Sequence, residues 1–350
     1  MHKYLHIPLW PFAQLYGGIM RLRNLAYDKG VRPSRRFGLP VIAVGNLTVG
    51  GTGKTPHVEY LLRLLHQYKV ATLSRGYKRK SKGFILADDT VTASILGDEP
   101  FQYHLDFKGV AVAVCEDRVK GVEQLQQQVP ELQVVVLDDA MQHRPVAPSL
   151  NLLITDFNRP FYRDHVLPAG RLREPRTGAK RADAVIVSKC PAELGQRERE
   201  EIAQQVTQYT TAGTPVFFST FTYGAPVAVG SGAKPGQKVL LLTGIANAEP
   251  LKKYLSGQGY TLLRHIAYPD HHPYTSKDLQ DLEELLQQED YRGAAVLTTR
   301  KDAVKLTDDG LEAITRQLPI FFVPIEVQFL ADGDMFDKLV LGHVKQLLPA

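Results

Sequence analysis

Short hydrophobic runs alternate with stretches of helical spacing from residue 40 onward. The runs are rich in Val, Ile and Leu and read PVIAVGN, KVATLS, GVAVAVC, LQVVVLDD, NLLITDF and ADAVIVSK. Between them, residues 54–67 and 117–128 place their hydrophobic side chains at helical spacing. Fully hydrophobic strands that alternate with helices predict a mostly parallel sheet that helices cover on both faces.

The pattern changes between residues 214 and 230, where two strand-like runs flank the turn signal YGAP. A second and shorter α/β series follows, and residues 334–348 have the spacing of a closing helix. A chain of 350 residues is long for one core, so two domains are expected. We therefore predict a larger domain over 1–213, a two-stranded linker over 214–230 and a smaller α/β domain over 231–350.

The N-terminal segment predicts an amphipathic helix. Its hydrophobic side chains fall on one face, led by an aromatic residue, at Trp10, Phe12, Leu15, Tyr16, Ile19 and Leu22. Arginines follow at 21, 23, 32, 35 and 36, as in helices that lie on anionic membranes. Most amphipathic helices face their own domain, which is the alternative here. Prolines and Gln14 interrupt the hydrophobic run, so we expect neither a membrane span nor a secretory signal, and a cytoplasmic protein.

Composition and charge exclude several classes of protein. Hydrophobic residues make up 44% of the chain and charged residues 23%, which excludes disordered and collagen-like chains. The net charge of +5 suggests an anionic partner. Cys115 and Cys190 adjoin strand-like runs without a metal-binding spacing, so we expect no disulfide framework and no structural zinc.

The most specific motif is VGNLTVGGTGKT, residues 44–55, in which a glycine-rich turn joins a buried strand to a helix. This is the context of a Walker A phosphate loop, and we assign nucleotide binding to Thr48, Val49, Gly50, Gly51, Thr52, Gly53, Lys54 and Thr55. Glycine lets backbone N–H groups approach phosphate, Lys54 reaches the β- and γ-phosphates, and Thr55 offers a Mg²⁺ ligand. Thr48 replaces the usual first glycine, and Val49 replaces the signature lysine of one group of switch ATPases.

A pair of acids at the end of a later strand complements this loop. Asp138 and Asp139 follow the run VVVL and are expected at the carboxyl edge of the sheet. Helix capping is the alternative role for such a pair. Because a Walker A loop lies upstream, we predict that they bind Mg²⁺.

These motifs, taken together, resemble the tetraacyldisaccharide 4′-kinase family. The matching stretches are VGNLTVGGTGKTP, LSRGYKRKSKG, GDEP, LDDAMQHR, LPAGRLREP, DHHPYT and KDAVKL, in this order along most of the chain. The resemblance implies a P-loop kinase that uses ATP and Mg²⁺ to phosphorylate the 4′-hydroxyl of an acylated glucosamine disaccharide 1-phosphate, giving lipid IVA. It also implies two α/β/α domains with a two-stranded linker, and work at the cytoplasmic face of the inner membrane, with no nucleic acid as partner.

The resemblance assigns roles to individual residues. It implies that Asp98 of GDEP is the catalytic base, although Asp98 alone is equally typical of a helix N-cap. It implies that a histidine of DHH supports this base, with His271 preferred over His272. Arg171 of LPAGRLREP is predicted to lie on a mobile lid and to meet the charge of the transferring phosphate.

The second strand is followed by four residues that we predict to bind substrate: Ser74, Arg75, Gly76 and Tyr77. Arginine suits this role because it binds phosphate through two parallel hydrogen bonds. Gln142 and His143, just after the acid pair, are predicted to line the same site. Arg300 stands before KDAVK, where the family often has an acidic residue, which leaves a role in nucleotide recognition open. A switch ATPase or GTPase with a protein partner, and a membrane-binding protein with a vestigial nucleotide site, are the alternative functions.

Overall fold

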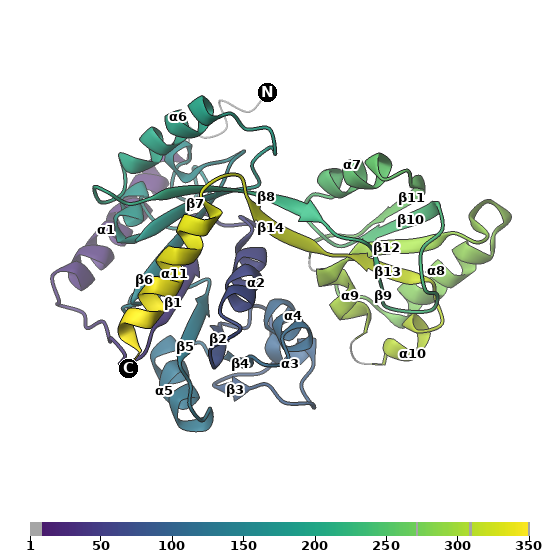
Figure 1. The fold of residues 1–350 in the computed structure, drawn as a ribbon, viewed down its shortest axis with the longest axis horizontal. Helices are drawn as coiled ribbons and strands as arrows, with labels where there is room; N and C mark the ends of the chain where they lie inside the picture. The colour runs from purple at the N-terminus through teal and green to yellow at the C-terminus, as the bar shows by residue number, and fades with distance from the viewer. Residues whose placement is uncertain (1–8, 271, 308–309, 349–350) are drawn as a thin grey trace.

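Two sheets, joined by an extended pair of strands, organise the molecule (Figure 1). The structure is a computed structural model that describes residues 9–270, 272–307 and 310–348. In the described part, the larger sheet has the strand order β14-β8-β7-β6-β1-β5-β2-β4-β3, and the smaller has the order β11-β10-β12-β13-β9. The predicted α/β class with a second, smaller domain is confirmed.

The larger sheet is parallel except at its two edges, where β3 and β14 run antiparallel to their neighbours. Its strands are β1 (Val41–Gly45), β2 (Val70–Ser74), β3 (Ile85–Leu86), β4 (Ala111–Val114), β5 (Val134–Asp138), β6 (Leu150–Asp156), β7 (Ala184–Ser188), β8 (Val216–Tyr223) and β14 (Ile325–Phe329). The inner strands are hydrophobic at nearly every position because both faces are covered.

Helices cover both faces of this sheet. On one face, α2 (Lys54–Leu64), α4 (Asp98–Asp106) and α11 (Gly333–Leu347) share a hydrophobic core. On the other, α5 (Arg118–Gln128) packs Val122 and Leu125 against β1 and β2. The remaining elements are α1 (Trp10–Asp28), α3 (Ala93–Leu96), α6 (Gln196–Thr207) and two 3₁₀ turns, Phe161–Arg163 and Arg176–Arg181.

The smaller sheet is parallel apart from β9, which pairs antiparallel with β13. Its strands are β9 (Val227–Ala228), β10 (Lys238–Thr243), β11 (Thr261–Ala267), β12 (Ala295–Thr299) and β13 (Ile320–Val323). Its helices are α7 (Glu249–Gly257), α8 (Ser276–Gln287), α9 (Arg300–Leu306) and α10 (Glu312–Thr315), with a 3₁₀ turn at Glu289–Tyr291.

The two-stranded linker does not lie wholly within 214–230, where the sequence predicted it. Strand β8 pairs with β14 from Ser219 to Tyr223, whereas β9 crosses to the smaller sheet. The YGAP turn therefore carries the chain into the smaller domain and does not fold it back. Periodicity identified both strands but gave no information on partners 100 residues apart in sequence.

The C-terminal boundary also differs from the predicted domain over 231–350. Helix α11 buries Phe336, Val340 and Val344 in the core of the larger domain, beside α2. The smaller domain is therefore an insertion between β8 and β14. The amphipathic pattern of residues 334–348 predicted a helix with one buried face, but it did not specify the domain that covers this face.

Helix α1 is docked on the larger domain through one face only. Ala13 and Gly17 are buried, and a Cβ on Gly17 would lie 3.3 Å from Val166. Tyr16 Oη donates to Arg173 O over 2.7 Å, so Tyr16 faces the protein and not the predicted membrane stripe. The structure thus confirms that one face of this helix packs on its own domain, and membrane contact by the opposite face stays a prediction. No helix in the described ranges is long and apolar enough to cross a bilayer.

Candidate active site

The phosphate loop follows β1 and leads directly into α2. Gly50 has a φ of 107° and Gly53 a φ of 87°, conformations that residues with a Cβ rarely adopt. Gly53 occupies the N-cap position, so α2 begins at Lys54 and its N-terminus points into the loop. This is the strand–loop–helix geometry that binds phosphate.

The first residues of the predicted loop have a different role. Thr48 forms an antiparallel bridge with Leu172, and the Val49 amide donates to Arg171 O over 2.8 Å. The amide of Val49 is therefore occupied by the protein, contrary to its predicted role in binding the nucleotide. These bonds tie the segment around Arg171 to the loop, which does not fit a freely moving lid, while the Arg171 side chain is exposed.

The acid pair lies beside Lys54 at the end of β5. Lys54 Nζ is 3.6 Å from Asp139 Oδ1, and Arg173 Nη1 is 2.9 Å from Asp139 Oδ2. Burial raises the pKa of Asp139, but Lys54 and Arg173 outweigh it and hold this pKa below its ordinary value. Asp139 is thus a carboxylate that keeps the Lys54 ammonium near the loop.

Asp138 is buried and has a different environment. Burial and the nearby charge of Glu99 raise its pKa to about 7. Tyr103 Oη donates to Asp138 Oδ2 over 3.2 Å, and Oδ1 has no hydrogen-bond partner among the described residues. A buried carboxylate with one unpaired oxygen is costly unless a cation or donor completes it. No helix begins at this pair, so the capping alternative does not apply.

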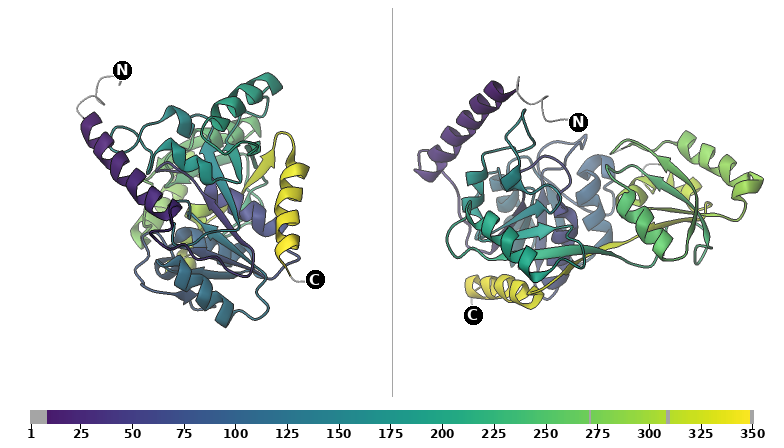
Figure 2. Two further views of the ribbon diagram at one scale, coloured as in Figure 1. Left: turned by 90° about the vertical axis from the view of Figure 1, so that its left-hand side faces the viewer. Right: turned by 90° about the horizontal axis from the view of Figure 1, so that it is seen from above.

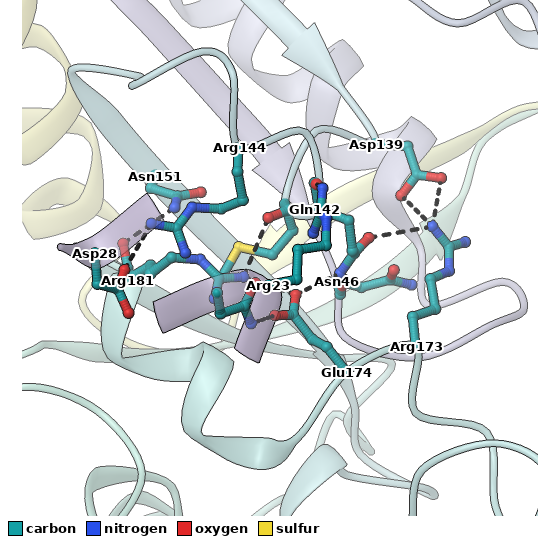
Figure 3. A network of polar contacts seen from close by, with 12 residues as sticks. Arg23, Asp28, Asn46, Asp139, Gln142, Arg144, Asn151, Arg173, Glu174 and Arg181 are labelled. Carbon is teal, nitrogen blue, oxygen red and sulfur yellow. Dashed lines mark hydrogen bonds and ion pairs between the residues drawn. The ribbon is translucent and has the colours of Figure 1, made fainter. Parts of the chain in front are cut away.

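Gln142 links Asn46, in the phosphate-loop motif, to Glu174 and to Arg173, which in turn binds Asp139 (Figure 3). Gln142 Nε2 donates to Asn46 O over 2.8 Å and to Glu174 Oε1 over 2.9 Å. Glu174 is fully buried, and it also accepts from Arg181. Gln142 therefore links the phosphate-loop motif to Glu174, a structural role that the sequence did not predict, and its predicted contact with substrate stays a prediction.

Arg75, Arg118 and His143 converge beside the acid pair. The buried Arg118 guanidinium donates to Asp138 O over 3.3 Å, and its backbone N–H donates to His143 Nε2 over 3.2 Å. Burial and the charges of Arg118 and Arg75 contribute to lowering the pKa of His143 to about 4, so it is a neutral imidazole. The exposed Arg75 leaves this cluster available to an anionic ligand.

The loop that carries Arg75 packs directly against the start of α4. A Cβ on Gly97 would lie 3.1 Å from Tyr77 O and 3.4 Å from the Gly76 backbone. Asp98 is the first residue of α4 and Gly97 its N-cap, so Asp98 does not occupy the capping position. The close approach places the predicted base next to the predicted substrate loop, with Ser74 buried behind it.

Of the two histidines of DHH, His271 lies outside the described residues. His272 is engaged within the smaller domain: Nε2 is 3.2 Å from Asp278 Oδ2, and the ring stacks on Tyr268 with centroids 4.1 Å apart. His272 thus has described partners within the smaller domain, and the choice of His271 as the partner of Asp98 stays a prediction.

Arg300 forms a contact between the domains. Its guanidinium pairs with Asp106 at the end of α4 and lies 4.7 Å from the centroid of the Phe322 ring. Val304 of α9 joins Leu96 and Phe101 in one hydrophobic cluster. Arg300 thus has a structural role between α9 and α4.

Glu59 connects α2 with α4 and predicts a pH-dependent stability. Burial raises its pKa to about 7; Arg63, Asp106 and Arg300 face it, and Gln102 donates to it. In the folded protein, Glu59 stays neutral up to about pH 7, whereas in the unfolded chain it ionises above about pH 4.5. The free energy of unfolding therefore falls as the pH rises from about 4.5 to about 7. We expect the free energy of unfolding of Glu59→Gln, relative to that of wild type, to rise by about 2–3 kcal/mol as the pH goes from 5 to 8. Urea unfolding of the two proteins at each pH measures this difference. A difference between the two proteins that does not change with pH would contradict this assignment.

Several site residues were not singled out by sequence reasoning. Tyr103, Arg118, Arg173 and Glu174 act through contacts that span 20 to 150 residues in sequence. Arg173 and Glu174 belong to LPAGRLREP, so the motif itself was the available signal, whereas Tyr103 and Arg118 lie in ordinary helical stretches.

Comparison with known proteins identifies the family. A family model described as tetraacyldisaccharide-1-P 4′-kinase (LpxK) matches residues 5–345. The chain is 42% identical over 346 residues to the tetraacyldisaccharide 4′-kinase of Flavobacterium johnsoniae, covering 97% of each chain. It is 43% identical over 337 residues to that of Cytophaga hutchinsonii, covering 94% of this chain and 93% of the relative.

A solved structure agrees with these relatives. The crystal structure of LpxK from Aquifex aeolicus in complex with ATP superposes with a TM-score of 0.77 at 30% identity, covering 97% of this chain and 99% of the other. The phosphate loop, the acid pair and the two-domain fold described above are thus found in a chain whose relatives are kinases. The chain belongs to the tetraacyldisaccharide-1-P 4′-kinase family.

Proposed function

We propose that this enzyme transfers the γ-phosphate of ATP to the 4′-hydroxyl of an acylated glucosamine disaccharide 1-phosphate, giving lipid IVA. Family membership carries the proposal. The arrangement of the phosphate loop, Lys54 and the acid pair supports it, because phosphoryl transfer needs a cradle for phosphate and a cation at the developing charge. A reaction with γ-labelled ATP and the disaccharide lipid tests it: label in the lipid is expected, and label released only as phosphate would favour a switch ATPase.

The acid pair fits a magnesium ion. Asp138 Oδ1 lies buried without a described partner, and the Tyr103 hydroxyl bridges Asp138 toward Thr55. The described residues contain no group of three metal-ligating side chains, which suits Mg²⁺, since it usually takes one or two carboxylates plus phosphate oxygens and water. We propose Asp138 and Thr55 as its protein ligands, with Asp139 holding Lys54. The bound ion would neutralise charge on the β- and γ-phosphates.

The other residues of the site act on the two substrates. Lys54 moves from Asp139 to the phosphates, and Asp98 accepts the proton of the attacking hydroxyl while His271 supports it. The exposed Arg75 and Arg171 meet the negative charge of the lipid and of the transferring phosphate. Because His143 Nε2 accepts from the Arg118 amide, Nδ1 of the neutral ring carries the proton and donates a hydrogen bond at the acceptor without adding charge.

The exposed face of α1 is proposed to bind the membrane that contains the lipid. Phe12, Leu15, Ile19 and Leu22 are 56% to 69% exposed, although they are large and hydrophobic. Figure 2 shows α1 at the periphery of the larger domain, away from the smaller one. Arg21, Arg32 and Arg36 are exposed nearby, whereas Arg23 is bound to Gln142 O and Arg35 to Glu123. The first set is therefore available to anionic lipid, and we propose association with the cytoplasmic face of the inner membrane.

Glutamate at two exposed positions tests this surface. We expect Phe12→Glu with Leu15→Glu to lower binding to vesicles of anionic lipid at least tenfold and to raise the KM for lipid, because each buried side chain contributes about 1.5–3 kcal/mol. The Kd for ATP should not change. Val227→Glu with Met335→Glu, which alters exposed hydrophobic residues elsewhere, is the matched control in cosedimentation. Full binding by the folded α1 variant would assign the membrane contact to another surface.

A further inference from the structure

Side chains at the end of β7 hold the phosphate loop from behind. Ser188 Oγ donates to Thr52 O over 2.6 Å, and Lys189 Nζ donates to Gly51 O. Ser188 is fully buried, and Lys189 has a φ of 58°, a conformation unusual for a residue with a side chain. Asp156 at the end of β6 pairs with Lys189 Nζ at 2.7 Å and directs it toward the loop. Two residues at the end of β7 therefore bind two consecutive carbonyl groups of the loop, and β6 supports one of them through Asp156.

A third carbonyl is held from α2. His57 Nδ1 lies 2.7 Å from Gly53 O, and since a carbonyl only accepts, this nitrogen carries the proton. His57 Nε2 then accepts from Ser219 Oγ of β8 over 2.9 Å. The Phe221 ring of β8 packs against Gly53, where a Cβ would lie 2.6 Å from the ring. The interdomain strand β8 thus contacts the same loop.

These bonds fix the direction of the loop's amides. A carbonyl and the N–H of the next residue belong to one planar peptide and point in opposite directions. Binding the carbonyls of Thr52 and Gly53 from one side turns the amides of Gly53 and Lys54 to the other side, toward the phosphate position. Binding Gly51 O fixes the peptide whose N–H closes the tight turn to Gly50 O at 3.1 Å.

We propose that Ser188, Lys189 and His57 are positioning residues that preorganise the phosphate loop for the phosphates of ATP. The inference rests on the proposed role of this loop in binding ATP. Its physical basis is that a loop held in its binding conformation loses less conformational entropy when the ligand binds. Without these donors, the carbonyls can rotate toward the phosphates, where they would repel negative charge.

Calorimetric titration of the full-length enzyme with Mg·ATP tests the inference. We expect Ser188→Ala and Lys189→Met each to raise the Kd about tenfold, and Lys189→Arg to restore binding, since it keeps a cationic donor. The KM for lipid should stay within twofold of wild type, a split that general destabilisation would not produce. If Ser188→Ala does not fold, Lys189→Met carries the test, because the Lys189 side chain is 32% exposed.

Two control variants separate loop positioning from lost stability. Thr298→Val removes a buried hydroxyl that donates to Leu242 O over 2.7 Å in the smaller domain, so it matches the stability cost of Ser188→Ala. Lys180→Met matches the loss of one exposed charge. Folded Ser188→Ala and Lys189→Met enzymes that bind Mg·ATP within twofold of wild type would overturn this inference alone. A wild-type enzyme that does not bind Mg·ATP would overturn the proposed function together with it.

Discussion

We expect replacement of Lys54 by methionine to lower kcat/KM for ATP by at least about 10³-fold. The ammonium lies at the N-terminus of α2 and is held near the loop by Asp139, 3.6 Å away. A preorganised cation at the charge that develops on the β- and γ-phosphates is worth several kcal/mol, because the site excludes water and needs little reorganisation. Methionine keeps most of the length of the side chain and removes the ammonium, with its charge and its hydrogen-bond donors. Steady-state transfer of labelled phosphate to lipid measures the loss.

Two observations accompany this variant. Asp139 loses one of its two cations but keeps Arg173 at 2.9 Å, so the melting temperature should change by only a few degrees. Lys180→Met provides a charge-matched control at an exposed position and should retain full activity. Near-normal turnover by the Lys54 variant would show that this loop is not the working phosphate site.

Asp98→Asn should lower kcat about 10²–10⁴-fold and leave the Kd for Mg·ATP within twofold of wild type. Asparagine preserves the size of the side chain at the start of α4 but cannot accept the proton of the attacking hydroxyl. Single-turnover kinetics at saturating ATP separates chemistry from binding. His271→Ala should lower kcat less, because this residue supports the base.

The pair is tested by the double variant. If Asp98 and His271 act as one unit, the combined loss in kcat should be far smaller than the product of the two single losses. Multiplicative losses would mean that the two side chains act independently, and Asp98 would then need another partner. Lys108→Met, at an exposed position just after α4, controls for general disturbance of this region.

The phosphate loop, the acid pair and the parallel sheet could be predicted because each is encoded in a contiguous stretch. Glycines before Lys54 are required by local backbone conformation, and Asp138 follows a run of strand residues. In such patterns the neighbouring residues in the sequence are enough to predict the local structure. The family resemblance supplied the substrate and the base, and periodicity alone would have supplied neither.

Other features depend on contacts that no local pattern encodes. Tyr103 is an ordinary helical position until the fold brings its hydroxyl to Asp138, 35 residues away. Gln142 was singled out because it follows the acids, but its hydrogen bonds to Asn46 O and Glu174 could not be predicted from its position in the sequence. Tyr16 shares the spacing of the exposed residues of α1, but its hydroxyl reaches a carbonyl of the larger domain. In each case a distant partner decides the role.

The place of the smaller domain between β8 and β14 has a consequence for synthesis on the ribosome. The smaller domain is continuous between Gly224 and Pro324, whose backbones are joined by a hydrogen bond of 3.0 Å, so it has all of its strands and helices once this stretch has emerged. The larger domain needs Phe336 and Val344 to complete the core beneath α2. Although its phosphate loop is made early, that domain must await α11, so we expect the smaller domain to fold first and the kinase core to close only once α11 has emerged from the ribosome.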